Sequence, residues 1–199
     1  MEGLYEECSK PLEEEKCLKK YNTIHVFSQI FLWLAIIMLF AGLFIFRMDV
    51  IWFFLIECVF FVVLWLVFNK WKSGVNVSYD YCLVSEGELR ISRVVNVDSR
   101  KLVVKIQCED ILQIGDIDNG NYERLASDPN TKTEICTSNE EAAENKFFMY
   151  ILVENEGKKL YVLECREQLL VYIMQYANRS ALEREYVKQD KKKKMQENA

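Results

Sequence analysis

The sequence predicts an α+β membrane protein in which a transmembrane helical hairpin precedes a small antiparallel β-barrel or sheet with a C-terminal amphipathic helix. Three observations support this class. Two long apolar segments, 24–46 and 50–68, lie in the N-terminal third. From residue 75 onward, apolar and polar side chains alternate with the period of two that is typical of strands. Toward the C-terminus, apolar residues recur at helical spacings of three and four.

The mean hydropathy of −0.05 conceals this division. Of the 199 residues, those at 24–72 carry a net charge of +1, those at 73–187 a charge of −7, and those at 188–199 a charge of +3. We therefore expect a cytoplasmic N-terminal segment (1–23), the hairpin (24–72), a cytoplasmic domain (73–187) and a basic tail (188–199). The acidic body argues against nucleic acid as a partner, since nucleic-acid binding requires a broad basic face.

The two apolar segments are long enough to cross a bilayer. At 1.5 Å per residue they would span roughly 34 and 28 Å, against a hydrocarbon core of about 30 Å. Only residues 47–49 separate them, which predicts a tight turn between antiparallel helices. A cleaved signal peptide fits poorly, because the first segment is too long and six glutamates precede it. Two buried core helices are the remaining alternative.

The positive-inside rule predicts the orientation of the hairpin. The connecting turn offers only Arg47, whereas lysines flank both outer ends, namely Lys16, Lys19, Lys20, Lys70 and Lys72. We therefore expect a multi-pass protein of the cell membrane with both termini in the cytoplasm, and the lipid bilayer as its first partner.

Glu57 is the intramembrane polar residue of this hairpin. A carboxylate near the middle of a membrane is costly, so it is by default a hypothesis for a functional site. Its antiparallel neighbours should lie near residues 40–42, where Ala41 and Gly42 permit close helix approach. The simplest interpretation is a protonated carboxyl group that is hydrogen-bonded within the hairpin or across a homo-oligomer. A proton or ion pathway would need a second titratable partner.

The β-rich part can be divided into elements by its periodicity and its turn residues. A polar stretch at 116–146 is long enough to be functional or mobile. The expected elements are a strand at 75–84, a turn at 85–87, a strand through 89–91, a turn at 96–101, a strand at 102–107, a helical turn or fourth strand at 108–114, an edge strand about 132–137, a hairpin of 147–154 with 159–164, and a helix from about 165 to 188.

The stretch over residues 77–91, Val-Ser-Tyr-Asp-Tyr-Cys-Leu-Val-Ser-Glu-Gly-Glu-Leu-Arg-Ile, resembles a segment of an uncharacterised family of small membrane proteins from clostridia-type bacteria. Residues 100–108 and Ile111 are similar to the next strand of that family. The resemblance covers most of residues 16–178 and implies two transmembrane helices before a cytoplasmic β domain, with no biochemical activity attached. The strand order, with one C-terminal helix, also resembles more distantly the pleckstrin-homology-like barrels of membrane-anchored bacterial proteins.

The inventory of reactive residues argues against an enzyme. His25 is the only histidine and begins the first apolar segment, so common His-containing triads and metal sites are unavailable. The seven cysteines contain no Cys-x-x-Cys pair. Residues 116–120 resemble the start of a calcium loop, but Asn121 and Ser127 stand where its Gly and Glu belong. We predict no catalytic, cofactor-binding or metal-binding residues.

Three functional hypotheses remain open. The preferred one is a non-enzymatic membrane protein whose cytoplasmic domain binds a protein partner through a strand edge or the 116–146 stretch. The second is a sensor of anionic lipid headgroups, although the acidic 85–88 turn departs from phosphoinositide-binding relatives. The third is a small membrane enzyme or transporter subunit that uses Glu57. The lipid-headgroup contacts of the second hypothesis would be Arg90, Arg93, Arg100, Lys101 and Lys105, helped by Lys188 and Lys191–Lys194 of the tail.

Overall fold

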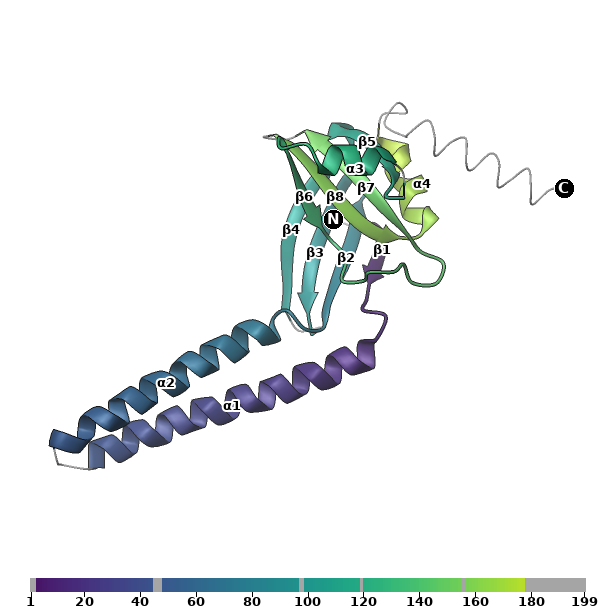
Figure 1. The fold of residues 1–199 in the computed structure, drawn as a ribbon. Helices are drawn as coiled ribbons and strands as arrows, with labels where there is room; N and C mark the ends of the chain where they lie inside the picture. Colours follow the sequence, from purple (N-terminus) through teal and green to yellow (C-terminus); the bar gives the residue numbers. More distant parts are fainter. Residues whose placement is uncertain (1–2, 45–47, 97–98, 119, 155–156, 178–199) are drawn as a thin grey trace. The chain divides into compact units, whose positions relative to one another are not determined.

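The structure is a computed structural model that describes residues 3–44, 48–96, 99–118, 120–154 and 157–177. The chain divides into two compact units, shown in Figure 1. One is a helical hairpin, within residues 13–77 together with 95–98. The other is a β domain, made of the described residues among 1–12, 78–94 and 99 onward.

The hairpin consists of α1 (Glu14–Phe44) and α2 (Met48–Lys72). α1 faces α2 through Ile24, Ser28, Ala35 and Gly42, which are its buried residues. Their spacing of four and seven places small side chains along one stripe, so the two backbones can approach closely. A Cβ added to Gly42 would lie 3.1 Å from the Cβ of Phe54. The predicted pair of helices is confirmed, and α1 begins ten residues before the apolar segment does.

The outer surface of the hairpin is apolar. Both helices are long and apolar enough to cross a membrane, and the most apolar window of α2 has no buried residue. Large side chains such as Trp33, Phe44, Trp52 and Phe53 are more than half exposed. A water-soluble protein rarely carries an apolar surface of this extent.

The β domain contains two four-stranded sheets and no closed barrel within the described residues. The first sheet has the order β1-β2-β3-β4 and the second the order β5-β7-β8-β6. The elements are β1 (Gly3–Ser9), β2 (Val77–Val84), β3 (Glu88–Val95), β4 (Ser99–Gln107), a 3₁₀ turn (Cys108–Asp110), β5 (Ile111–Asp116), α3 (Gly120–Ala126), β6 (Thr131–Ile135), β7 (Phe147–Glu154), β8 (Lys158–Cys165) and α4 (Glu167–Tyr176).

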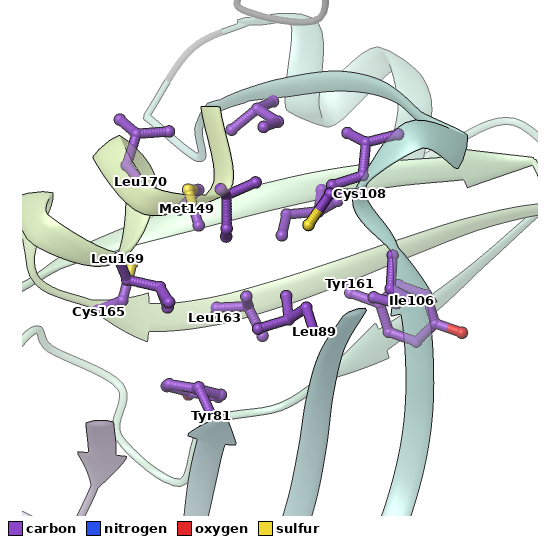
Figure 2. Packing of buried hydrophobic residues seen from close by; sticks show 14 of the residues in the cluster. Tyr81, Leu89, Ile106, Cys108, Met149, Tyr161, Leu163, Cys165, Leu169 and Leu170 are labelled. Carbon is purple, nitrogen blue, oxygen red and sulfur yellow. The ribbon is translucent and has the colours of Figure 1, made fainter. Parts of the chain in front are cut away.

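One hydrophobic core joins the two sheets and α4 (Figure 2). Leu89 comes from the first sheet, Leu163 from the second and Leu169 from α4, and all three are fully buried. α4 presents its apolar stripe to this core, as the three- and four-residue spacing predicts. The observed order of strands and a final helix agrees with the predicted α+β class.

The structure of the N-terminal residues differs from the expected one, in which residues 1–23 form a segment separate from the β domain. In the structure residues 3–9 form β1, which pairs antiparallel with β2, so that Ser9 lies opposite Tyr79. The hairpin is therefore an insertion between two neighbouring strands of one sheet. Both of its ends connect to the same domain.

β6 forms at the place of the expected edge strand about 132–137, although its parallel pairing with β8 was not foreseen. The helix α3 inside the polar 116–146 stretch was not foreseen either. α4 ends at Tyr176, where Ala177 adopts an extended backbone, so a continuous helix to residue 188 is wrong. The basic tail at 188–199 lies outside the described residues.

Candidate functional site

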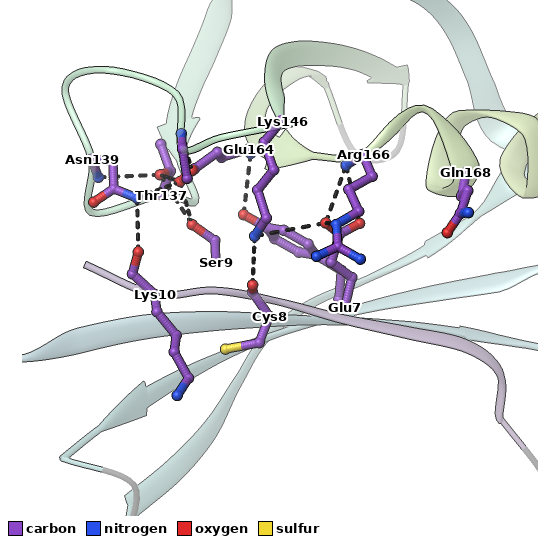
Figure 3. Close-up of polar contacts among 12 residues, drawn as sticks. Glu7, Cys8, Ser9, Lys10, Thr137, Asn139, Lys146, Glu164, Arg166 and Gln168 are labelled. Atoms are coloured by element: carbon purple, nitrogen blue, oxygen red, sulfur yellow. Dashed lines mark hydrogen bonds and ion pairs between the residues drawn. The ribbon is translucent and has the colours of Figure 1, made fainter. Parts of the chain in front are cut away.

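A buried carboxylate, Glu164 of β8, organises the polar contacts at one side of the β domain (Figure 3). Its Oε2 accepts hydrogen bonds from Ser9 Oγ at 2.5 Å, Asn139 Nδ2 at 2.6 Å and Thr137 Oγ1 at 2.9 Å. Its Oε1 accepts one from the backbone N–H of Ala143 at 2.9 Å. The carboxylate thus ties β1 and the 137–143 segment to β8.

The hydrogen bonds also decide the charge state of Glu164. Burial alone would raise the pKa of this carboxyl, but the donors from Ser9, Ala143, Asn139 and Thr137 together lower it below its ordinary value. Next to it, burial raises the pKa of the Tyr81 phenol, which donates to the carbonyl of Cys136 at 2.7 Å. Because Glu164 is saturated by donors and sealed from solvent, it is a structural group rather than a reactive one.

A second carboxylate, Glu7, holds β1 from the neighbouring position. Lys146 Nζ donates to the carbonyl of Cys8 at 2.6 Å and lies 3.6 Å from Glu7 Oε1, with both side chains largely buried. The backbone N–H of Arg166 lies 3.1 Å from both Glu7 oxygens. Hydrogen bonds and ion pairs therefore hold β1 to the β8–α4 junction, in addition to its pairing with β2 in the sheet.

Three of the five predicted headgroup contacts are ion-paired within the first sheet. Arg90 Nε contacts Glu88 Oε1, and Lys105 Nζ lies 4.0 Å from the same oxygen. Arg100 Nη2 lies 2.5 Å from Asp80 Oδ2. The structure thus intersperses these cations with carboxylates, which lowers the positive potential that an anionic surface would meet.

The other two predicted contacts, Arg93 and Lys101, line a groove of about 440 Å³ in the β domain. The groove lies between β4 and β6, each of which is the last strand of its sheet among the described strands. Its walls combine apolar, basic and acidic side chains. They are Tyr79, Arg93, Lys101, Leu102, Val103, Glu134, Ile135 and Cys136.

The rim of this groove is unusually apolar for an exposed surface. Ile135 is 63% exposed, Leu102 46% and Val103 40%. The outer side of an edge strand also presents unpaired backbone N–H and C=O groups. Such a groove offers apolar contacts and a hydrogen-bonding ladder together, which are the requirements of an added strand.

Glu57 does not pack where the sequence analysis placed it. The helix register puts Gly42 against Phe54, while Cys58 donates to the carbonyl of Ala35 at 3.4 Å. Glu57 itself is exposed on the hairpin surface and makes no hydrogen bond or ion pair with a described residue. The register therefore places Glu57 nearer residue 38 than the expected residues 40–42, and of the two expected bonds only one to a second copy stays a prediction.

His25 Nδ1 lies 3.4 Å from Lys72 Nζ at the open end of the hairpin. Burial raises the pKa of Cys108 to about 11 and that of Cys136 to about 12, so these thiols stay protonated. No three acidic, Cys or His side chains among the described residues converge as metal ligands.

The model of a bacterial PH-like domain family, DUF6106, matches residues 14–183. The chain belongs to this family. The match includes both long helices and every strand of the PH-like domain except β1, which precedes it. No curated protein matches the chain. No solved structure matches it either.

Family membership agrees with the resemblance seen in the sequence, a PH-like domain preceded by two apolar helices. PH-like domains are typically non-catalytic. The Glu164 network was not predicted, although the sequence contained a signal for it. Glu164 interrupts the apolar run 160–165, just as Glu57 interrupts an apolar helix. At both positions, a single carboxylate within a continuous apolar stretch is the sequence pattern that indicates a carboxyl group in unusual surroundings.

Proposed function

We propose that the protein is a non-enzymatic, membrane-anchored interaction domain that binds an extended segment of a partner protein in the β4–β6 groove. The hairpin inserts into the cell membrane, and both of its ends face the cytoplasm. The groove between two open sheet edges is the observation that carries the proposal. The apolar surface of α1 and α2 supports insertion, and the flanking lysines support the orientation.

The groove favours a particular chemistry in the partner segment. Exposed Leu102, Val103 and Ile135 fit alternating apolar side chains of an added strand. Glu134 already has a cation near it, because Lys132 Nζ lies 2.9 Å from its Oε1. Lys101 at the rim makes no ion pair with a described residue. We therefore infer a segment that alternates apolar residues and carries a carboxylate opposite Lys101.

The alternative of an anionic-lipid sensor is less favoured by the same geometry. Arg90, Arg100 and Lys105 would have to give up contacts with Glu88 or Asp80 to meet a phosphate. Each exposed pair is weak, about 1 kcal/mol or less, but the carboxylates would remain near the bilayer surface. A protein segment in the groove requires no such exchange.

The proposal is tested with the full chain in nanodiscs, because a fragment that starts at residue 73 lacks β1 and its contacts to Glu164. Random peptides displayed on phage are selected on this sample, and the Kd of the enriched peptides is measured. We expect sequences with alternating apolar residues and an acidic position. Ile135→Asp should weaken their binding at least about tenfold, because it places a charge in the apolar rim.

A matched control is Leu112→Asp on β5, since Leu112 is also an exposed apolar residue, at 46% against 63% for Ile135, on a different strand. It should leave the Kd unchanged. Peptides that bind equally well to the Ile135→Asp protein would contradict the groove. Lipids are tested separately by hydrogen exchange of residues 88–107 in neutral and in anionic nanodiscs. Protection that appears only with anionic lipid would favour the headgroup alternative instead.

A further inference from the structure

Glu57 occupies an unusual place on the surface of the hairpin. It is exposed on α2, one helical turn from Phe53 and from Phe60, which are 68% and 58% exposed. This face therefore consists of large apolar side chains around one carboxyl group. On α1, residues 30–44 contain only apolar side chains and Gly42.

In a membrane this carboxyl group would lie deep in the hydrocarbon. Glu57 is seven residues from the start of the apolar run 50–68 and eleven from its end, or about 10 and 16 Å along the helix. A short glutamate side chain cannot reach the interface from there. An unpaired polar group at this depth costs free energy, and a hydrogen-bond partner from another chain removes that cost.

The depth of Glu57 restricts which group can be that partner in a second copy. Two copies insert with the same orientation, so equivalent residues lie at equal depth. The register of Cys58 with Ala35 and of Phe54 with Gly42 places Glu57 level with about residue 38 of α1. The nearest hydrogen-bonding side chain of α1 is Trp33, whose indole only donates and which lies about 8 Å farther along the helix; Gln29 and Ser28 lie at least about 13 Å farther along it.

An uncharged carboxyl group is self-complementary, since it has one O–H donor and one carbonyl acceptor. Two such groups at the same depth can therefore satisfy each other without any other residue. We propose that two copies associate in the membrane through the α2 face that carries Glu57, with their two carboxyl groups hydrogen-bonded to each other. This inference rests on the membrane insertion that forms part of the proposed function, and it is independent of the groove.

Insertion is measured first by alkaline extraction of native membranes. Release of the full chain into the soluble fraction would contradict insertion and the dimer together. Retention followed by a monomeric state would contradict the dimer alone. The dimer is then measured by fluorescence energy transfer between labelled copies in bilayers over a range of lipid-to-protein ratios.

We expect the wild-type chain to dimerise and Glu57→Gln to dimerise similarly, because an amide is also self-complementary. Glu57→Leu should weaken the dimer about tenfold, or by about 1.4 kcal/mol, because it removes the hydrogen bonds between the two copies while improving the apolarity of the helix. A wild-type chain that stays monomeric overturns the proposal. So does a dimer that Glu57→Leu leaves unchanged.

Cysteine crosslinking identifies the face independently. A cysteine at Phe60, one turn from Glu57, should crosslink between copies, and a further Glu57→Leu change should reduce the yield. Val59 is the matched control, because it is 63% exposed but points about 160° away from Glu57 around the helix. Equal crosslinking from both positions would contradict a specific interface.

Discussion

The β domain and the hairpin each contain a carboxyl group in an apolar stretch of sequence, but they treat it in opposite ways. Glu164 receives four hydrogen bonds from its own chain. Glu57 receives none from any described residue and stands on the surface of α2. The β domain therefore satisfies its buried carboxylate within one chain, whereas the carboxyl group on the hairpin is the one for which we propose a second copy as partner.

Removal of the internal carboxylate should destabilise the β domain more than any other change considered below. Glu164→Ala leaves Ser9, Thr137 and Asn139 without their acceptor, and buried unsatisfied groups cost about 1–3 kcal/mol each. We expect the β domain to lose about 3 kcal/mol or more of its free energy of unfolding. Hydrogen exchange of the full chain measures this loss. Glu164→Gln keeps the shape and one acceptor, so it should cost about half as much.

Acid should reproduce part of this loss without a mutation. The pKa of Glu164 is lowered in the folded protein, so its stabilising contribution is complete above the ordinary value of 4.5 and disappears as the pH falls below it. The hydrogen-exchange protection of residues 3–9 and 137–143, corrected for intrinsic exchange rates, should decrease as the pH is lowered from about 4.5 through the depressed pKa of Glu164. The same fall in a Glu164→Gln protein would show that other groups are responsible.

A smaller effect should follow from loosening β1 alone. Lys146→Met removes the bond to the carbonyl of Cys8 and the ion pair with Glu7. We expect a loss of about 1–2 kcal/mol, concentrated in the exchange protection of residues 3–9. Lys132→Met is the matched control, because Lys132 pairs with Glu134 on an exposed edge and should cost less than about 0.5 kcal/mol.

Removal of the carboxyl group on the hairpin should have the smallest effect on the stability of the β domain. Glu57→Leu should change the stability of the β domain by less than about 0.5 kcal/mol, because Glu57 is exposed on α2 and makes no hydrogen bond or ion pair with a described residue. Hydrogen exchange of the domain strands measures it in detergent, where copies can be kept apart by dilution. A large loss there would mean that Glu57 has an intramolecular role.

Local patterns were sufficient to predict much of the fold. The apolar segments predicted the hairpin, and period-two alternation predicted β2, β4, β7 and β8 close to their observed bounds. Gly87 was correctly identified as a turn residue, and its φ of +75° is one that glycine adopts readily. These elements are specified by neighbouring residues, which is why the sequence reveals them.

The rest depends on residues far apart in the chain. β1 reads Gly-Leu-Tyr-Glu-Glu-Cys-Ser, which has no clear alternation, and it becomes a strand only by pairing with β2. The parallel pairing of β6 with β8 likewise needs the whole sheet. The groove was not predicted because Lys101 and Ile135 come from different sheets. The basic residues were recognised from their charge, but their acidic neighbours became apparent only from the register.

The insertion of the hairpin between β1 and β2 has a consequence for biosynthesis. Ser9 leaves the ribosome 70 residues before its partner Tyr79, an interval of about 4–14 s at typical rates of synthesis. During that interval both apolar helices are made and β1 has no strand to join. The first sheet can therefore be completed only after both apolar helices have been synthesised.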